Sequence, residues 1–266
     1  MQANCFGDDS TYDYKTLVAE LERYLRLRTV PVGMKRFATV KEMEAVPRIR
    51  RPQGEKFATD QIVGQSRWLK WTIGITMDDL MGVQCGAVVG LAPRDANFLS
   101  GERMSGVWYG TIEDSTSHQA AMTCAPHGDY QALAVSPLAS GRLDNPDICL
   151  IYATPGQMIT FINGLQYKNY RKLNFSCVGE SACADSWGNA LATGEPSVSI
   201  PCYAERAFGG VQDDEMLIAI PPSYLPSVVE GLASLNRNGL RYPIVNHGIQ
   251  KSPLESIERS YGASGT

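Results

Sequence analysis

Residues 146–158 have the sequence PDICLIYATPGQM, and this stretch decides how the rest of the chain is interpreted. Ile148–Tyr152 is a continuous apolar run, which is typical of a strand buried on both faces. Thr154 and Pro155 follow as N-cap and first helical residue, so a helix is expected to begin there. Strand, Thr-Pro turn and helix in this order resemble half of a βαβ unit, which predicts an α/β fold.

Similar patterns on both sides of this stretch predict further elements. Strands are expected at 31–37, 71–76, 130–135, 173–176, 197–200 and 216–220, and helices at 10–27, 60–70 and 113–124 and from 181 and 221 onward. We therefore expect an α/β (or α+β) fold in which a mixed sheet with several buried strands is flanked by helices. The simplest organisation is a single domain, 1–266, in which 1–9 and 240–266 are extended termini.

The composition excludes several classes of protein. The chain has 266 residues, is 44% hydrophobic, and has 24 basic against 28 acidic residues, so it has no basic footprint for nucleic acid. No apolar run approaches the ~18 residues of a membrane span, and residues 1–9 lack the features of a signal peptide. We expect a cytoplasmic protein that binds neither nucleic acid nor membrane. A homo-oligomer is expected because closed homo-oligomers are common among such proteins.

The seven cysteines are an odd number and accompany no export signal, which indicates reduced thiols. The chain contains no CxxC pair, GxGxxG loop, Walker loop or HExxH motif, so the strongest local signals for zinc, clusters and nucleotides are missing. The three histidines, His118, His127 and His247, are far apart in the sequence, and each is expected to be an ordinary hydrogen-bonded or surface residue.

The segment 179–215 is the densest in residues that can carry chemistry. Cys183 lies in the first turn of a predicted helix, where the helix dipole favours a thiolate, and Cys202 lies at a strand end four residues before Arg206. Two activated thiols at element ends suit binding of a metal or an iron–sulfur cluster, or action as a nucleophile pair. The alternative is that Cys183, with alanine on both sides, only fills a tight packing position.

An acidic run, Asp213, Asp214 and Glu215, precedes a buried strand in the same segment. A turn with charges directed to water would explain it, but we favour carboxylates that orient Arg206 by bidentate contact.

The other cysteines have simpler explanations on local sequence alone. Cys85 lies among small residues and Cys149 lies inside the buried strand, while Cys5, Cys124 and Cys177 are consistent with small buried apolar residues.

Several separated motifs together resemble the uncharacterised ArCR-like family, domain of unknown function family 169. They are SACAD, GEPSVSIPC with the following YAER and AFGG, and QDDEMLIAIPP, together with PVGMKRF, CGAxxGL, SPL and the opening PDICLIYATPGQM. The resemblance is specific because these motifs occur in the expected order, and it covers roughly Leu17 to Leu235.

The resemblance implies a protein of anaerobic prokaryotes, archaea included, and the family supplies no activity that could be expected here. Members typically carry the cysteines that match Cys85, Cys183 and Cys202, and many have a fourth where this chain has Ala58. Three thiolates from separated segments suit a cluster, such as 4Fe–4S, with one open or non-cysteine iron position, or a soft metal. Asp185 and Arg206 would then tune the site.

The sequence therefore leaves three functions open and does not settle whether the protein is an enzyme. The first is a cysteine-ligated iron–sulfur or soft-metal protein of anaerobic metabolism with a redox or accessory role, acting on a small molecule or a redox partner protein. The second is a metal-free enzyme or binder of a small organic anion that uses Cys183 and Arg206. The third is a structural oligomeric scaffold. Three sulfurs within ~7 Å of one another would favour the first.

Overall fold

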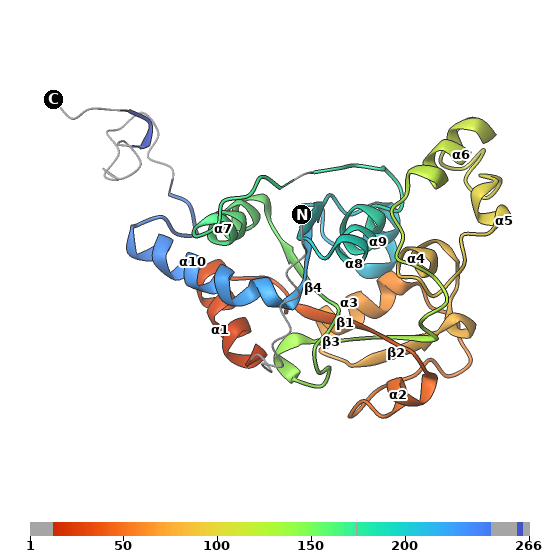
Figure 1. Ribbon diagram of the computed structural model, residues 1–266, viewed down its shortest axis with the longest axis horizontal. Helices are drawn as coiled ribbons and strands as arrows, with labels where there is room; N and C mark the ends of the chain where they lie inside the picture. The colour runs from red at the N-terminus through yellow and green to blue at the C-terminus, as the bar shows by residue number, and fades with distance from the viewer. Residues whose placement is uncertain (1–12, 174, 246–259, 263–266) are drawn as a thin grey trace, which may run out of the picture.

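A six-stranded sheet forms the centre of the protein in the computed structural model, which describes residues 13–173, 175–245 and 260–262 (Figure 1). The strands are β1 Val32–Phe37, β2 Ile73–Thr76, β3 Ala132–Pro137, β4 Ile148–Ala153, β5 Ser197–Ser199 and β6 Met216–Ile220. Their order across the sheet is β2-β3-β1-β4-β6-β5, and every neighbouring pair is antiparallel.

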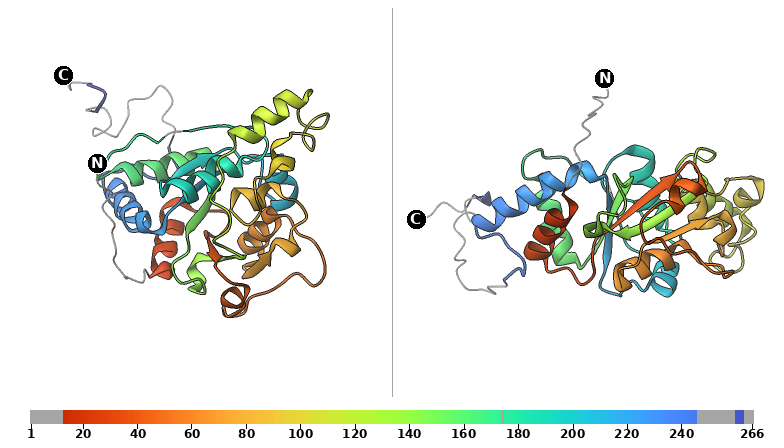
Figure 2. Two further views of the ribbon diagram at one scale, coloured as in Figure 1. Left: turned by 45° about the vertical axis from the view of Figure 1, so that its right-hand side comes forward. Right: turned by 90° about the horizontal axis from the view of Figure 1, so that it is seen from below.

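Helices lie on both sides of this sheet, as the views in Figure 2 show. They are α1 Tyr14–Leu25, α2 Val40–Glu44, α3 Thr59–Leu69, α4 Gln84–Val88, α5 Ala96–Leu99, α6 Ile112–Ala121, α7 Pro155–Gln166, α8 Asn189–Thr193, α9 Tyr203–Gly209 and α10 Leu225–Arg237. The predicted class, an α/β fold whose buried strands are flanked by helices, is confirmed.

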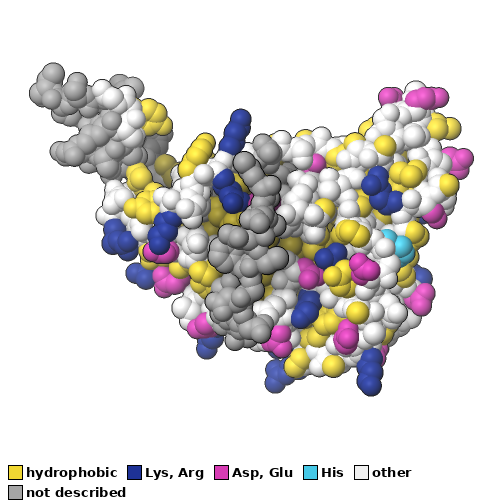
Figure 3. Space-filling model, in the orientation of Figure 1, with side chains coloured by type: hydrophobic (Ala, Val, Ile, Leu, Met, Phe, Trp, Pro, Cys, Tyr) yellow, Lys and Arg dark blue, Asp and Glu magenta, His cyan; other side chains and the backbone are white. Residues whose placement is uncertain are grey.

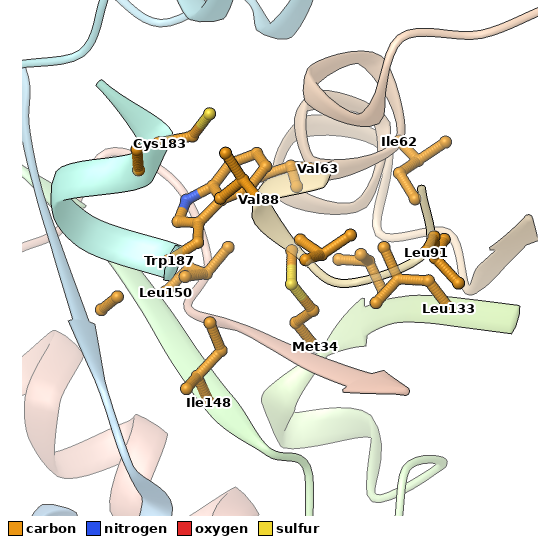
Figure 4. Close-up of a cluster of buried hydrophobic side chains, with 14 of the residues drawn as sticks. Met34, Ile62, Val63, Val88, Leu91, Leu133, Ile148, Leu150, Cys183 and Trp187 are labelled. Carbon is orange, nitrogen blue, oxygen red and sulfur yellow. The ribbon is translucent and has the colours of Figure 1, made fainter. Parts of the chain in front are cut away.

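Strand β4 shows how the two faces are filled, because its side chains alternate between two apolar clusters. Leu150 and Tyr152 join the cluster that contains residues of α3 and α4, while Cys149 and Ile151 join the cluster formed with α1, α7 and α10. Both faces of the strand are thus buried, which explains its continuous apolar sequence. Figure 4 shows part of the first cluster, in which Trp187 packs beside Val88.

The parallel βαβ arrangement suggested by residues 146–158 is wrong. The helix forms as predicted: Thr154 accepts a hydrogen bond from the Gln157 backbone, and the Gln157 side chain accepts one from Thr154 in return. However, β4 pairs antiparallel with both β1 and β6. An antiparallel strand covered on both faces has the same apolar pattern as a parallel one, so the pattern alone could not distinguish them.

Several predicted boundaries also change. The cap of α1 is Asp13, whose carboxylate accepts from the Thr16 backbone, whereas the predicted cap Ser10 lies outside the described residues. The strand expected at 173–176 is reduced to a single bridge between Phe175 and Val198. The expected extended termini, 1–9 and most of 240–266, also fall outside the described residues.

The distribution of surface charge and the lengths of the helices concern the expected absence of nucleic-acid and membrane binding. On the face in Figure 3, basic and acidic side chains are intermingled and form no continuous basic region. No helix within the described parts of the chain is long and apolar enough to cross a membrane.

Candidate functional site

Two cysteines that are far apart in the sequence are in contact on the α3 and α4 side of the sheet. Cys85 is the second residue of α4, and Cys183 begins the helical segment that continues as a π-helix, Ala184–Gly188. Their Sγ atoms lie 3.5 Å apart, although 98 residues separate them in the chain. The structure thus brings together two of the three cysteines that the sequence proposes as ligands.

Unusual backbone geometry places Cys183 beside α4. Ser181 has φ +63°, a left-handed conformation that is uncommon for a residue with a side chain, and the π-helix begins three positions later, at Ala184. At Gly188 a Cβ atom would lie 2.1 Å from the Thr123 carbonyl oxygen, so only glycine permits this close approach. Fully buried Trp187 anchors the same turn, and Figure 4 shows Cys183 next to it at the edge of the apolar cluster. Such costly local features cluster at functional sites.

The Asp60 carboxyl group is the third member of this contact. Asp60 lies in the first turn of α3 and is only 2% exposed. Its Oδ2 accepts a hydrogen bond from the Cys85 thiol at 3.5 Å, while its Oδ1 is buried without a partner. Burial raises the pKa of Asp60 to about 6.

Cys202 approaches the pair from a third segment, the start of α9. It is 8% exposed, and its backbone N–H donates to Glu205 Oε2 at 3.0 Å. Helix α9 packs closely on α3 because Gly64 has no side chain: a Cβ there would lie 2.4 Å from the Gly209 carbonyl oxygen. The hydrogen bond with Cys85 and burial raise the pKa of the Cys183 thiol, and the charge of Cys202 adds a smaller contribution in the same direction.

Glu205 adds a second buried carboxyl group. It is 1% exposed, and its Oε1 has no hydrogen-bond partner. Burial, and then the charge of Asp60, raise the pKa of Glu205 to about 8. The charge of Asp60 thus adds to burial in disfavouring the ionised form of Glu205.

The lowered thiol pKa values expected from helix dipoles and from Arg206 are wrong. At Cys183 the hydrogen bond with Cys85, together with burial, raises the pKa well above its ordinary value. Burial and the Glu205 carboxyl raise the pKa of Cys202. The hydrogen bond from Cys183 lowers the pKa of Cys85, but burial and nearby carboxyl groups outweigh it and bring the value to about 11. All three thiols therefore hold their protons at neutral pH.

Glu180 ties the Cys183 segment to its surroundings. Its carboxylate accepts from the backbone N–H groups of Tyr203 and Ala204, at the start of α9. Its carbonyl oxygen accepts from Nε2 of His118 in α6 at 2.7 Å. The segments that carry Cys183 and Cys202 are thus joined through one residue.

The two residues expected to tune the site are directed elsewhere. Asp185 is buried, and its carboxylate accepts from the Ser176 hydroxyl at 2.6 Å and from the Val178 N–H at 2.7 Å, so it orders the loop before Cys183. Arg206 donates to the Gln212 carbonyl oxygen on the surface.

The favoured contact between Arg206 and the acidic run is also replaced by other pairs. Asp214 binds Arg28 bidentately at 2.8 Å. Glu215 forms a fully buried ion pair with Arg67 at 2.8 Å. Asp214 and Glu215 therefore tie the segment before β6 to Arg28 and to Arg67 of α3 rather than orienting Arg206.

The remaining cysteines and histidines that the structure describes lie apart from this site. Cys149 is buried in the sheet as expected, but the expectation that Cys124 and Cys177 are buried is wrong, because Cys124 is only partly buried and Cys177 is exposed. His118 and His127 bind backbone carbonyls. Cys5 and His247 lie outside the described residues. Across the described ranges, no three His, Cys, Asp or Glu side chains are already arranged to hold a metal ion.

Sequence reasoning missed Asp60, Glu180 and Glu205. Glu205 had a local signal, because an acidic residue three positions after Cys202 has the spacing of a helix-capping contact. Asp60 had no such signal, because an acidic residue in the first turn of a helix is usually explained by its favourable interaction with the helix dipole. Its position alone therefore does not indicate a functional site.

Comparisons with known proteins identify the relatives of this chain but no activity. The family described as "Uncharacterised ArCR" (domain of unknown function 169) matches residues 20–231. "Uncharacterized protein MJ0308" of Methanocaldococcus jannaschii is 23% identical over 88 residues, a match that spans 33% of this chain and 38% of that relative. No solved structure matches.

Proposed function

We propose that this chain, which belongs to the uncharacterised ArCR family, binds a soft metal centre through cysteine thiolates. The centre is a single ion or an iron–sulfur cluster, and its ligands come from Cys85, Cys183 and Cys202. The observation that carries the proposal is the 3.5 Å separation of the Cys85 and Cys183 sulfurs. Two thiolates on one tetrahedral ion, with bonds near 2.3 Å, stand about 3.8 Å apart, so little movement is needed.

The charge balance of the site supports the same function. The carboxyl groups of Asp60 and Glu205 are buried beside the thiols, and neither forms an ion pair with another described residue. Each also has one oxygen without a hydrogen-bond partner. Such groups are expensive to bury unless a cation or a proton compensates them. A metal ion would displace the protons and supply that charge.

The two alternatives have less support. A metal-free nucleophile needs a lowered thiol pKa, whereas the pKa of Cys183 is raised, and Arg206 is directed to the Gln212 carbonyl. A purely structural role leaves unexplained why two buried carboxyl oxygens lack partners, because proteins rarely leave such groups unsatisfied.

We extend the proposal to a redox or accessory role in the cytoplasm of an anaerobic prokaryote, with a small molecule or a redox protein as partner and a homo-oligomer as the assembly. This part rests on the family resemblance and on the general frequency of homo-oligomers.

The test is anaerobic purification followed by measurement of zinc, iron and acid-labile sulfide per chain. We expect a stoichiometric metal content that Cys85→Ser and Cys183→Ser each abolish. Cys177→Ser is the matched control, because Cys177 is a free cysteine that is exposed, and its metal content should equal that of the wild type. Metal-free wild type after reconstitution with zinc, and with iron and sulfide, would refute the proposal. Sulfide equimolar with iron would identify a cluster, and its absence a single ion.

A further inference from the structure

We propose that the Asp60 carboxylate joins the thiolates of Cys85 and Cys183 as an oxygen ligand of one divalent ion of intermediate softness, Zn²⁺ or Fe²⁺. This inference rests on the proposed metal-binding function and specifies its donor set and its preferred ion.

The distances around Cys85 support a mixed sulfur and oxygen site. Its Sγ lies 3.5 Å from Sγ of Cys183 and 3.5 Å from Oδ2 of Asp60. In a tetrahedral site with sulfur bonds near 2.3 Å and oxygen bonds near 2.1 Å, the sulfur–sulfur edge is about 3.8 Å and the sulfur–oxygen edge about 3.6 Å. Both separations lie within a few tenths of an ångström of these edges. Among the described residues no three such side chains are yet arranged as a complete metal site, so Asp60 and Cys183 must also move toward a shared ion when it binds.

A comparison with the other buried aspartate of this region separates a ligand from a structural carboxylate. Both oxygens of Asp185 accept hydrogen bonds, from Ser176 and from Val178, as expected for a residue that orders a loop. Asp60 is more deeply buried, yet one oxygen has no partner and the other has only a thiol. A buried carboxylate with an unpartnered oxygen lacks the hydrogen bonds or the opposite charge that would offset the cost of its burial. A bound cation would provide that opposite charge.

The donor set then determines which ion is preferred. Thiolates alone suit very soft ions such as Cu⁺, whereas a carboxylate adds affinity for harder, divalent ions. Two thiolates and one carboxylate therefore favour Zn²⁺ or Fe²⁺ and weaken the preference for Cu⁺. Two thiolates 3.5 Å apart also match a shared ion better than separate irons of a cluster, because the cluster edge would intervene between them.

The experiment titrates Co²⁺, as a spectroscopic substitute for Zn²⁺, and Cu⁺ into anaerobic metal-free protein. Asp60→Asn should weaken Co²⁺ binding by about 10-fold to 100-fold or more and change the visible ligand-field bands, while Cu⁺ binding changes little. Asp60→Cys should keep Co²⁺ bound and strengthen the thiolate charge-transfer absorption. The control is Glu230→Gln, which removes a surface carboxylate paired with Lys168 and should leave the Co²⁺ spectrum unchanged. Circular dichroism confirms that each variant is folded.

The outcomes separate this inference from the proposed function. If Cys183→Ser abolishes Co²⁺ binding but Asp60→Asn leaves both affinity and spectrum unchanged, the inference is wrong and the metal site stands. If Asp60→Asn weakens Co²⁺ and Cu⁺ equally, the carboxylate acts only through its charge, and its assignment as a ligand is also wrong. If wild-type protein binds neither ion, the proposed function itself fails.

Discussion

Glu205→Gln should make the stability of the metal-free protein less dependent on pH. Glu205 is 1% exposed, and burial and the Asp60 carboxyl raise its pKa from 4.5 to about 8 in the folded protein. A carboxyl with a raised pKa stabilises the fold below its unfolded value and loses that contribution as pH rises through the folded value. Its stabilising effect is therefore complete below pH 4.5 and is lost as the pH approaches 8.

The size of the effect follows from this pKa difference. At about 1.4 kcal/mol per pKa unit, the change corresponds to a loss on the order of 5 kcal/mol between pH 4.5 and 8. Glutamine cannot ionise, but its side-chain oxygen can still accept from the Cys202 N–H that Glu205 now binds. The variant should thus resemble the wild type at pH 5 and be more stable by several kcal/mol at pH 8.

Guanidinium unfolding in EDTA at pH 5, 6.5 and 8 measures this difference. The exposed Glu230, which pairs with Lys168 on the surface, provides the control: Glu230→Gln should keep the pH dependence of the wild type. If the wild type and Glu205→Gln lose stability in parallel between pH 5 and 8, the proposed burial of an uncompensated carboxyl group is refuted.

Three further predictions concern the thiols and their support. Zinc binding should release protons and tighten as pH rises, because the pKa of Cys85 is about 11 and the thiol of Cys183 is also protonated. Calorimetry in buffers of different ionisation enthalpy measures the number of protons released. Zinc binding without proton release would contradict this prediction. Diamide should join Cys85 and Cys183 as a disulfide in metal-free protein, since their sulfurs lie 3.5 Å apart; peptide mapping should find this link, and its persistence in Cys202→Ser but not in Cys183→Ser identifies the pair. Gly64→Ala should lower stability by about 1–3 kcal/mol and weaken metal binding, because its Cβ would lie 2.4 Å from the Gly209 carbonyl oxygen. Guanidinium unfolding measures the stability, and metal titration measures the affinity. If neither changes, α3 and α9 can move apart without cost and the prediction is wrong.

The sequence predicted the elements of the fold better than their arrangement. The strand at Ile148–Ala153 and the helix that Thr154 caps follow from local patterns that need no knowledge of distant residues. Strand direction depends on partners far along the chain, so the antiparallel order could not be predicted from local patterns. The contact of Cys183 with Cys85 is equally non-local, and only the family resemblance pointed to it.

The errors at the site have the same origin. Arg206 was paired with its acidic neighbours because they are close in sequence, but Asp214 and Glu215 bind Arg28 and Arg67, which lie 186 and 148 residues from them. The pKa directions were reversed because a helix N-terminus favours a thiolate only where burial and carboxyl groups do not oppose it. A single sequence shows neither which distant arginine will pair with an acidic residue nor how deeply a thiol will be buried.

The sequence separation of 98 positions between Cys85 and Cys183 also affects when the site can form. A CxxC pair can capture a metal ion on a nascent chain, because its two sulfurs are neighbours before any folding occurs. Here the first sulfur leaves the ribosome long before the second, and closing so long a loop is entropically unfavourable without the sheet that holds it. If this pair binds a metal ion as proposed, capture of that ion is a late event of protein synthesis, because it needs a chain that has already folded around its last strands.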